Sequence, residues 1–127
     1  MTLTPRQEEI KAAFIAQEGT WDDSWEAVLE LDPEFLAAYI GFAGVPKRER
    51  HLDAKTQAFI GLAVDAATTH LHAPGIRRHI ETALAAGATR QEVMEVLECT
   101  ATLAIHAMNV GVPVLVEVLA ERGIRTE

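Results

Sequence analysis

The chain has 127 residues, of which 49% are hydrophobic and 24% are charged, a balance typical of a globular protein and a length that suits one domain. Its formal net charge of −8 excludes the clustered excess of lysine and arginine that nucleic-acid binding requires. The charged N-terminus lacks the apolar run of a signal peptide, and no later segment is expected to reach transmembrane length. A single cysteine cannot form a disulfide within the chain, so it requires no oxidising compartment. We therefore expect a cytoplasmic protein without nucleic-acid or membrane partners.

Three short helices are predicted in the first third of the chain. The first and the third begin with a polar cap and a proline, at Thr4-Pro5 and Asp32-Pro33, because proline suits the first turn of a helix. The second spans residues 21–31, and a polar loop over residues 44–52 follows the third. The large aromatic side chains of this part are expected to pack in the core: Trp21, Trp25 and Tyr39.

Two helices are predicted in the middle of the chain. Asp53 caps the first of them. Pro74 disfavours helical geometry at the preceding residue, so residues 69–75, which include two histidines, are predicted to connect the two helices. The second helix then ends at Gly87, since glycine readily adopts the conformation that follows a helix.

The longest predicted helix begins at Thr89, which forms a capping box with Glu92. Residues 111–113, Gly-Val-Pro, are expected to break it, and a last helix spans residues 114–122. Apolar side chains cover almost the whole circumference of the last helix, and one small chain can hardly bury such a surface. We therefore expect a homo-oligomer held together by apolar helices.

Polar side chains recur along the longest predicted helix at spacings of three and four residues, which places them on one face. They are Glu95, Cys99, Thr102, His106 and Asn109. One interpretation is an exposed polar stripe. The other is that Cys99, Thr102 and His106 line a cavity and contact a bound substrate.

Three histidines and one aspartate lie close together in the sequence: Asp65, His70, His72 and His79. A carboxylate within reach of an imidazole fixes its tautomer and supports proton transfer, which is the usual construction of a general acid or base. Metal binding is the alternative, but the spacing of these histidines matches no standard zinc motif and lacks soft ligands. We therefore expect no metal.

Two neighbouring arginines, Arg77 and Arg78, precede His79. Either guanidinium could hold a substrate carboxylate through paired hydrogen bonds, although a single arginine is more often only solvated. The sequence has no phosphate-binding glycine loop, nucleophile elbow or dinucleotide fingerprint. This excludes the familiar cofactor classes, and we expect no cofactor.

Two segments resemble the carboxymuconolactone decarboxylase superfamily, namely Leu-Asp-Ala-Lys-Thr at residues 52–56 and residues 79–93, where a histidine lies eight residues before Gly-Ala-Thr-Arg. With the downstream helix, the resemblance covers roughly residues 52 to 120. It implies an all-α, single-domain helical bundle of the alkylhydroperoxidase D-like type with about six to seven helices. The core would span residues 52–122 with residues 1–51 as a helical extension packed on it, and the subunits would form trimers or hexamers.

One branch of that superfamily consists of thiol peroxidases with a Cys-x-x-Cys-x-x-x-His motif. Counting back from His79, this chain has His72 and Gly75 at the two cysteine positions of that motif. The peroxidases also use a glutamate in their catalytic relay, and the corresponding position here is Ala58. Without the two thiols, the disulfide cycle has neither nucleophile nor resolving partner. A thiol peroxidase is therefore disfavoured, and a divergent peroxidase-like protein stays only as an alternative.

The other branch consists of cofactor-independent decarboxylases that act on small carboxylated lactones of aromatic catabolism. This resemblance implies that a histidine protonates carbon after carbon dioxide leaves. His79 would be that acid, with His72 or Asp65 tuning it, while Arg77 or Arg78 holds the carboxylate and His70 contacts the substrate. The remaining alternative is a non-catalytic oligomer that binds a small ligand.

Overall fold

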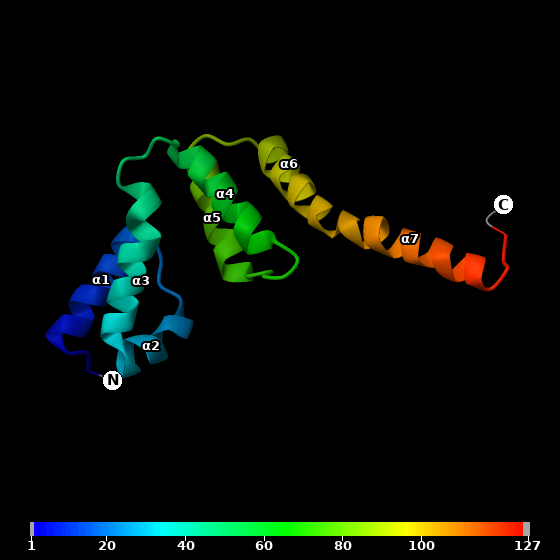
Figure 1. Ribbon diagram of the computed structural model, residues 1–127. Helices are drawn as coiled ribbons and strands as arrows, with labels where there is room; N and C mark the ends of the chain where they lie inside the picture. Colours follow the sequence, from blue (N-terminus) through cyan, green and yellow to red (C-terminus); the bar gives the residue numbers. More distant parts are fainter. Residues whose placement is uncertain (1, 126–127) are drawn as a thin grey trace. The chain divides into compact units, whose positions relative to one another are not determined.

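The computed structural model describes residues 2–125, and every regular element in that range is helical. Its α-helices are α1 (Pro5–Glu18), α2 (Glu26–Leu31), α3 (Pro33–Gly44), α4 (Ala54–Ala66), α5 (Ala73–Ala85), α6 (Arg90–Ala101) and α7 (His106–Glu121) (Figure 1). Short 3₁₀ turns occupy Asp23–Trp25, Val45–Lys47 and Thr102–Ile105. The predicted all-α fold is confirmed. The chain divides into two compact units between Gln57 and Ala58.

The first unit is built from α1, α2 and α3, which pack on one another. Its buried core consists of Ile10, Phe14, Leu29 and Leu36. Trp21 and Trp25 pack against this core, with the Trp21 ring 5.2 Å from the Phe14 ring in an edge-on arrangement. Trp21 and Trp25 therefore belong to packing, as the sequence predicted. Tyr39 does not belong to the core, because it is exposed, and its ring stacks on the Trp25 ring, 5.1 Å away.

The second helix begins later than residue 21. Asp22 caps a 3₁₀ turn by accepting a hydrogen bond from the Ser24 backbone N–H at 2.8 Å, and α2 begins only at Glu26. Asparagine and aspartate side chains favour such local turns over helix interiors, which explains the delayed start. The helix starts at Thr4 and Asp32 are as predicted, and the Thr4 capping box is complete.

Ion pairs join the helices of the first unit at its surface. Arg6 donates two hydrogen bonds to the Glu34 carboxylate, at 2.8 and 2.9 Å, and Lys11 lies 2.9 Å from Glu26. The hydrogen bond from Arg6 holds the pKa of Glu34 below its usual range, and that from Lys11 does the same for the pKa of Glu26.

Acid is therefore expected to weaken the first unit. A carboxylate whose folded pKa lies below its unfolded pKa contributes stability above the unfolded value, near 4.5, and loses it as the pH falls through the folded pKa. Glu34→Gln should lower the urea midpoint at pH 7 and reduce its change between pH 7 and pH 3. Tryptophan fluorescence reports this unit, because both tryptophans lie in it. Glu30→Gln on α2 is the control, and an equal effect of the two substitutions would contradict the assignment.

In the second unit, α4 and α5 pack closely, and α6 adds Val93 to the buried residues. Ala58, Leu62 and Asp65 form the buried face of α4 at helical spacing. The connection to α5 covers residues 67–72 rather than 69–75, and α5 already begins at Ala73. Pro74 occupies the first turn, where its missing N–H costs nothing, so it starts this helix instead of delaying it.

The longest predicted helix breaks earlier than expected. A 3₁₀ turn at residues 102–105 separates α6 from α7, and Pro113 lies inside α7. The Thr100 hydroxyl donates to the Val96 carbonyl at 2.8 Å and the Thr102 hydroxyl to the Cys99 carbonyl at 2.6 Å. Such side-chain bonds compete with the helical backbone bonds and bend helices, which explains the position of the break.

Residues 101–125 are exposed, apart from a partly buried Leu119. The helical stretch Arg90–Glu121 contains an 18-residue window with a mean hydropathy of 1.8, none of it buried, and is long and apolar enough to cross a membrane by length and composition. The prediction that no segment reaches transmembrane length is therefore wrong. Between its charged ends, this stretch has an uninterrupted neutral interior, Cys99 to Val116.

Candidate functional site

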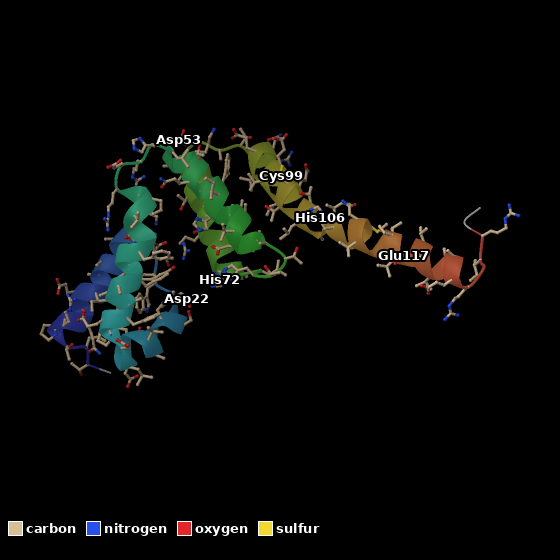
Figure 2. The ribbon with its side chains drawn as sticks, in the orientation of Figure 1. Asp22, Asp53, His72, Cys99, His106 and Glu117 are labelled. Carbon is tan, nitrogen blue, oxygen red and sulfur yellow. The ribbon has the colours of Figure 1, made fainter. Side chains whose placement is uncertain are left out.

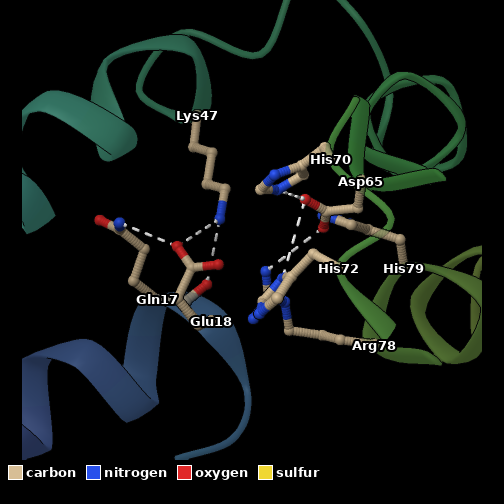
Figure 3. Close-up of polar contacts among 8 residues, drawn as sticks. All are labelled: Gln17, Glu18, Lys47, Asp65, His70, His72, Arg78 and His79. Carbon is tan, nitrogen blue, oxygen red and sulfur yellow. Dashed lines mark hydrogen bonds and ion pairs between the residues drawn. The ribbon is translucent and has the colours of Figure 1, made fainter. Parts of the chain in front are cut away.

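Asp65 lies at the centre of a cluster of basic side chains in the second unit (Figure 3). It is 8% exposed, and its two carboxylate oxygens face different partners. Oδ1 lies 3.1 Å from His70 Nε2 and 4.0 Å from His72 Nδ1. Oδ2 lies 3.2 Å from His79 Nε2 and 4.0 Å from Arg78 Nη2. One buried carboxylate therefore joins three imidazoles and a guanidinium.

The backbone between α4 and α5 brings His70 and His72 to the same oxygen. The His70 N–H donates to the Ala67 carbonyl and the His72 N–H to the Asp65 carbonyl, each at 2.8 Å. Leu71 between them has a φ of 46°, in the left-handed region that side chains other than glycine rarely adopt. The two imidazole rings consequently lie 5.4 Å apart, centre to centre. Backbone strain of this kind is concentrated at functional sites.

Two glycines allow the close approach of α4 and α5. A Cβ atom at Gly61 on α4 would collide with the His79 ring. A Cβ atom at Gly75 on α5 would collide with the Asp65 carboxylate and lie 2.7 Å from His72 Nδ1. His72 and Gly75 are the positions that the resemblance to peroxidases assigned to cysteines, and both lie against Asp65. The space that a side chain would fill at position 75 is here taken by this carboxylate.

Gly75→Ala is therefore expected to destabilise the second unit by about 1–3 kcal/mol, the usual cost of overpacking a close-packed site. The Asp65 side chain is short and buried, so it cannot move aside freely. Gly41→Ala on α3 is a matched control, because nothing lies within 4 Å of a Cβ there, and alanine favours a helix interior by roughly 0.5–1 kcal/mol. Urea unfolding followed by circular dichroism measures both. Equal stability of Gly75→Ala and the parent would contradict this packing.

The contact of Asp65 with His79 is close but poorly aligned for a hydrogen bond. Oδ2 is fully enclosed and makes no hydrogen bond of good geometry, although His79 Nε2 is within 3.2 Å. A buried, ionised carboxylate whose oxygen lacks a well-aligned hydrogen bond attracts a protonated imidazole, since charge interactions strengthen away from water. The pair can therefore orient His79 and stabilise it while it carries a proton.

The two arginines behave differently. Arg77 pairs with Glu81 one turn away at 3.0 Å, and its side chain is 80% exposed. It does not approach Asp65 in the structure. Arg78 has a largely buried side chain and lies on the Asp65 side of α5, so only this guanidinium joins the cluster.

Two residues of the predicted polar line, Glu95 and Cys99, border one groove. Cys99 borders an open groove of about 560 Å³ between α4 and α6, whose lining residues are Phe59, Ala63, Glu92, Glu95, Val96, Cys99 and Thr100. Thr102 and His106 are not among the residues that line this groove and both are exposed, since the 3₁₀ turn interrupts the helical spacing. Figure 2 shows Cys99 on α6 and His106 at the start of α7. This groove therefore does not bring Cys99, Thr102 and His106 together.

Sequence and structure comparisons place this arrangement in a known group of proteins. Residues 33–120 match the profile of the carboxymuconolactone decarboxylase family. The chain belongs to this family. The matched region begins at Pro33, so it includes α3 and extends beyond the segment from residue 52 that the motifs alone indicated.

A solved structure agrees with this membership. The crystal structure of a Burkholderia xenovorans LB400 protein, provisionally assigned as a gamma-carboxymuconolactone decarboxylase subunit, is 50% identical and superposes with a TM-score of 0.83. The match covers 98% of this chain and 50% of that chain, so this carboxymuconolactone decarboxylase family member spans about half the length of its structural relative. A comparison with curated proteins found no match.

Proposed function

We propose that this protein decarboxylates a small carboxylated lactone of aromatic catabolism, with His79 as the general acid. The observation that carries the proposal is the 3.2 Å contact between His79 Nε2 and the buried carboxylate of Asp65. Family membership supports the class of reaction, and the absence of cysteine at positions 72 and 75 disfavours a thiol peroxidase.

In the proposed reaction, the bond between the ring carbon and the substrate carboxylate breaks and carbon dioxide leaves. The electron pair of that bond delocalises toward the lactone carbonyl, and His79 then donates its proton to carbon. Solvent returns a proton to His79. Asp65 is the positioning residue that holds the imidazole in the orientation for transfer, as a carboxylate does for a catalytic histidine in other enzymes. Arg78, whose guanidinium lies 4.0 Å from Asp65 Oδ2, is the arginine that would hold the substrate carboxylate before it leaves.

The test follows the ultraviolet absorbance of carboxymuconolactone incubated with the purified protein. His79→Ala is expected to lower turnover by at least about 10²-fold, the lower range for loss of a positioned acid. His106→Ala is the matched control, because that histidine is exposed on α7 outside the cluster. Equal turnover by His79→Ala and the parent would contradict the proposal, as would a parent that consumes hydroperoxide instead of the lactone.

We further propose that the exposed apolar surface of α7 is covered by other copies of this chain, in a trimer or a hexamer. The large hydrophobic side chains on α7 are about half exposed, which is unusual for a folded chain in water. They include Met108, Val110, Val114, Leu115 and Val116. The relative of known structure is described as a subunit and is about twice as long, which supports association of such units.

A further inference from the structure

Asp65, His70 and His72 present three metal-ligand atoms close together. Each residue offers one such atom, and all three lie within 4.8 Å of one another. The carboxylate belongs to α4 and both imidazoles to the connection before α5. Imidazole nitrogen and carboxylate oxygen are the ligands that zinc and neighbouring divalent ions take in open sites with three protein ligands.

Both imidazoles face the same carboxylate oxygen, Asp65 Oδ1, but they lie at different distances from it. His70 Nε2 is within hydrogen-bond distance of Asp65 Oδ1, at 3.1 Å, whereas His72 Nδ1 stops at 4.0 Å. A cation between the three atoms would satisfy both nitrogen lone pairs and the oxygen together. The opposite oxygen, Oδ2, faces His79 and Arg78, so the carboxylate can bind a cation on one side and stay oriented from the other.

We propose that Asp65, His70 and His72 bind one divalent first-row transition metal ion, with zinc as the reference ion. Ligand distances of about 2.0–2.1 Å in a tetrahedral site place donor atoms about 3.3 Å apart. The Asp65–His70 separation of 3.1 Å already meets this requirement. His72 lies 4.0 Å from the same carboxylate oxygen and has to move closer to both other ligand atoms. The His72 and His70 side chains are 41% and 52% exposed, so both can rotate and the fourth position opens to solvent.

The sequence spacing conceals this site. His-x-His resembles no zinc motif without a third ligand, and the third ligand is separated from it by the end of α4 and a turn. The backbone hydrogen bond from His72 to the Asp65 carbonyl and the left-handed Leu71 close that turn. The site goes beyond the proposed decarboxylation, because binding requires neither the lactone nor turnover.

The experiment is calorimetric titration of the chelator-treated protein, free of any polyhistidine tag, with Zn²⁺. Cobalt is a second probe, because its visible absorption reports imidazole and carboxylate ligands directly. We expect one ion per chain, and at least about tenfold weaker binding in His70→Ala and in His72→Ala. Circular dichroism of the metal-free variants checks that each is folded, and Asp65→Asn, which keeps the side-chain volume, tests the third ligand.

His51→Ala and His106→Ala are the matched controls, since both histidines are exposed outside the cluster. Unchanged binding in both controls, with weakened binding in the folded His70 and His72 variants, supports the site. It is overturned if the parent binds no ion, or if the control substitutions weaken binding as much as the cluster substitutions. A parent that binds zinc but leaves the lactone unchanged refutes the proposed function alone.

Discussion

Asp65→Asn is expected to reduce the turnover number by about 10²- to 10⁴-fold while the protein stays folded. Asparagine has the same shape as aspartate, but it carries no charge to stabilise the protonated His79 and cannot hold its tautomer. Because Asp65 acts through His79 rather than on the substrate, kcat should fall while KM changes little. Steady-state kinetics on the lactone, followed by absorbance, separate the two constants.

Asp53→Asn provides the matched control for this substitution. Asp53 caps α4 by accepting a hydrogen bond from the Thr56 N–H at 2.7 Å, which holds the pKa of this carboxyl below its usual range. Asparagine caps helices as well as aspartate, so this variant should keep both its fold and its activity. If Asp65→Asn and Asp53→Asn turn over the lactone equally, Asp65 does not position the acid.

The helix boundaries that depend on local chemistry could be predicted from the sequence. Caps at Asp53 and Thr89 act through neighbouring backbone atoms, and both occur where expected. The break after Ala101 could not be predicted, because it depends on threonine hydroxyls that compete weakly with the helix. Gly111 and Pro113 are the stronger sequence signals, yet α7 continues through both.

The candidate site, too, could be predicted from the sequence only in part. The proximity of Asp65 to the histidines was expected from their nearness in sequence, and the structure places these groups together. The convergence of His70 and His72 on one oxygen could not be foreseen, because it depends on the backbone conformation at Leu71. The sequence could not show why position 75 is a glycine, since only the structure shows that the Asp65 carboxylate lies where a Cβ atom would be.

A charge on α7 is expected to abolish self-association. Leu115→Glu places a carboxylate in the apolar surface of that helix, where burial against another copy would leave it unpaired at a cost of several kcal/mol. The parent should therefore have a mass in light scattering that is a multiple of 13.9 kDa, and the variant should have the mass of one chain. Glu117→Gln, a neutral substitution on the same helix, should leave assembly intact.

The same experiment separates a protein interface from a membrane span. If α7 packs against another copy, the parent should stay assembled without detergent. The uncharged stretch from Cys99 to Val116 contains the polar residues His106 and Asn109, which are compatible with a protein interface that partly faces water. A parent that stays a single chain, or that associates only with phosphatidylcholine vesicles, would refute self-association through α7. Loss of assembly in Leu115→Glu but not in Glu117→Gln would show that apolar burial between copies is what this helix requires.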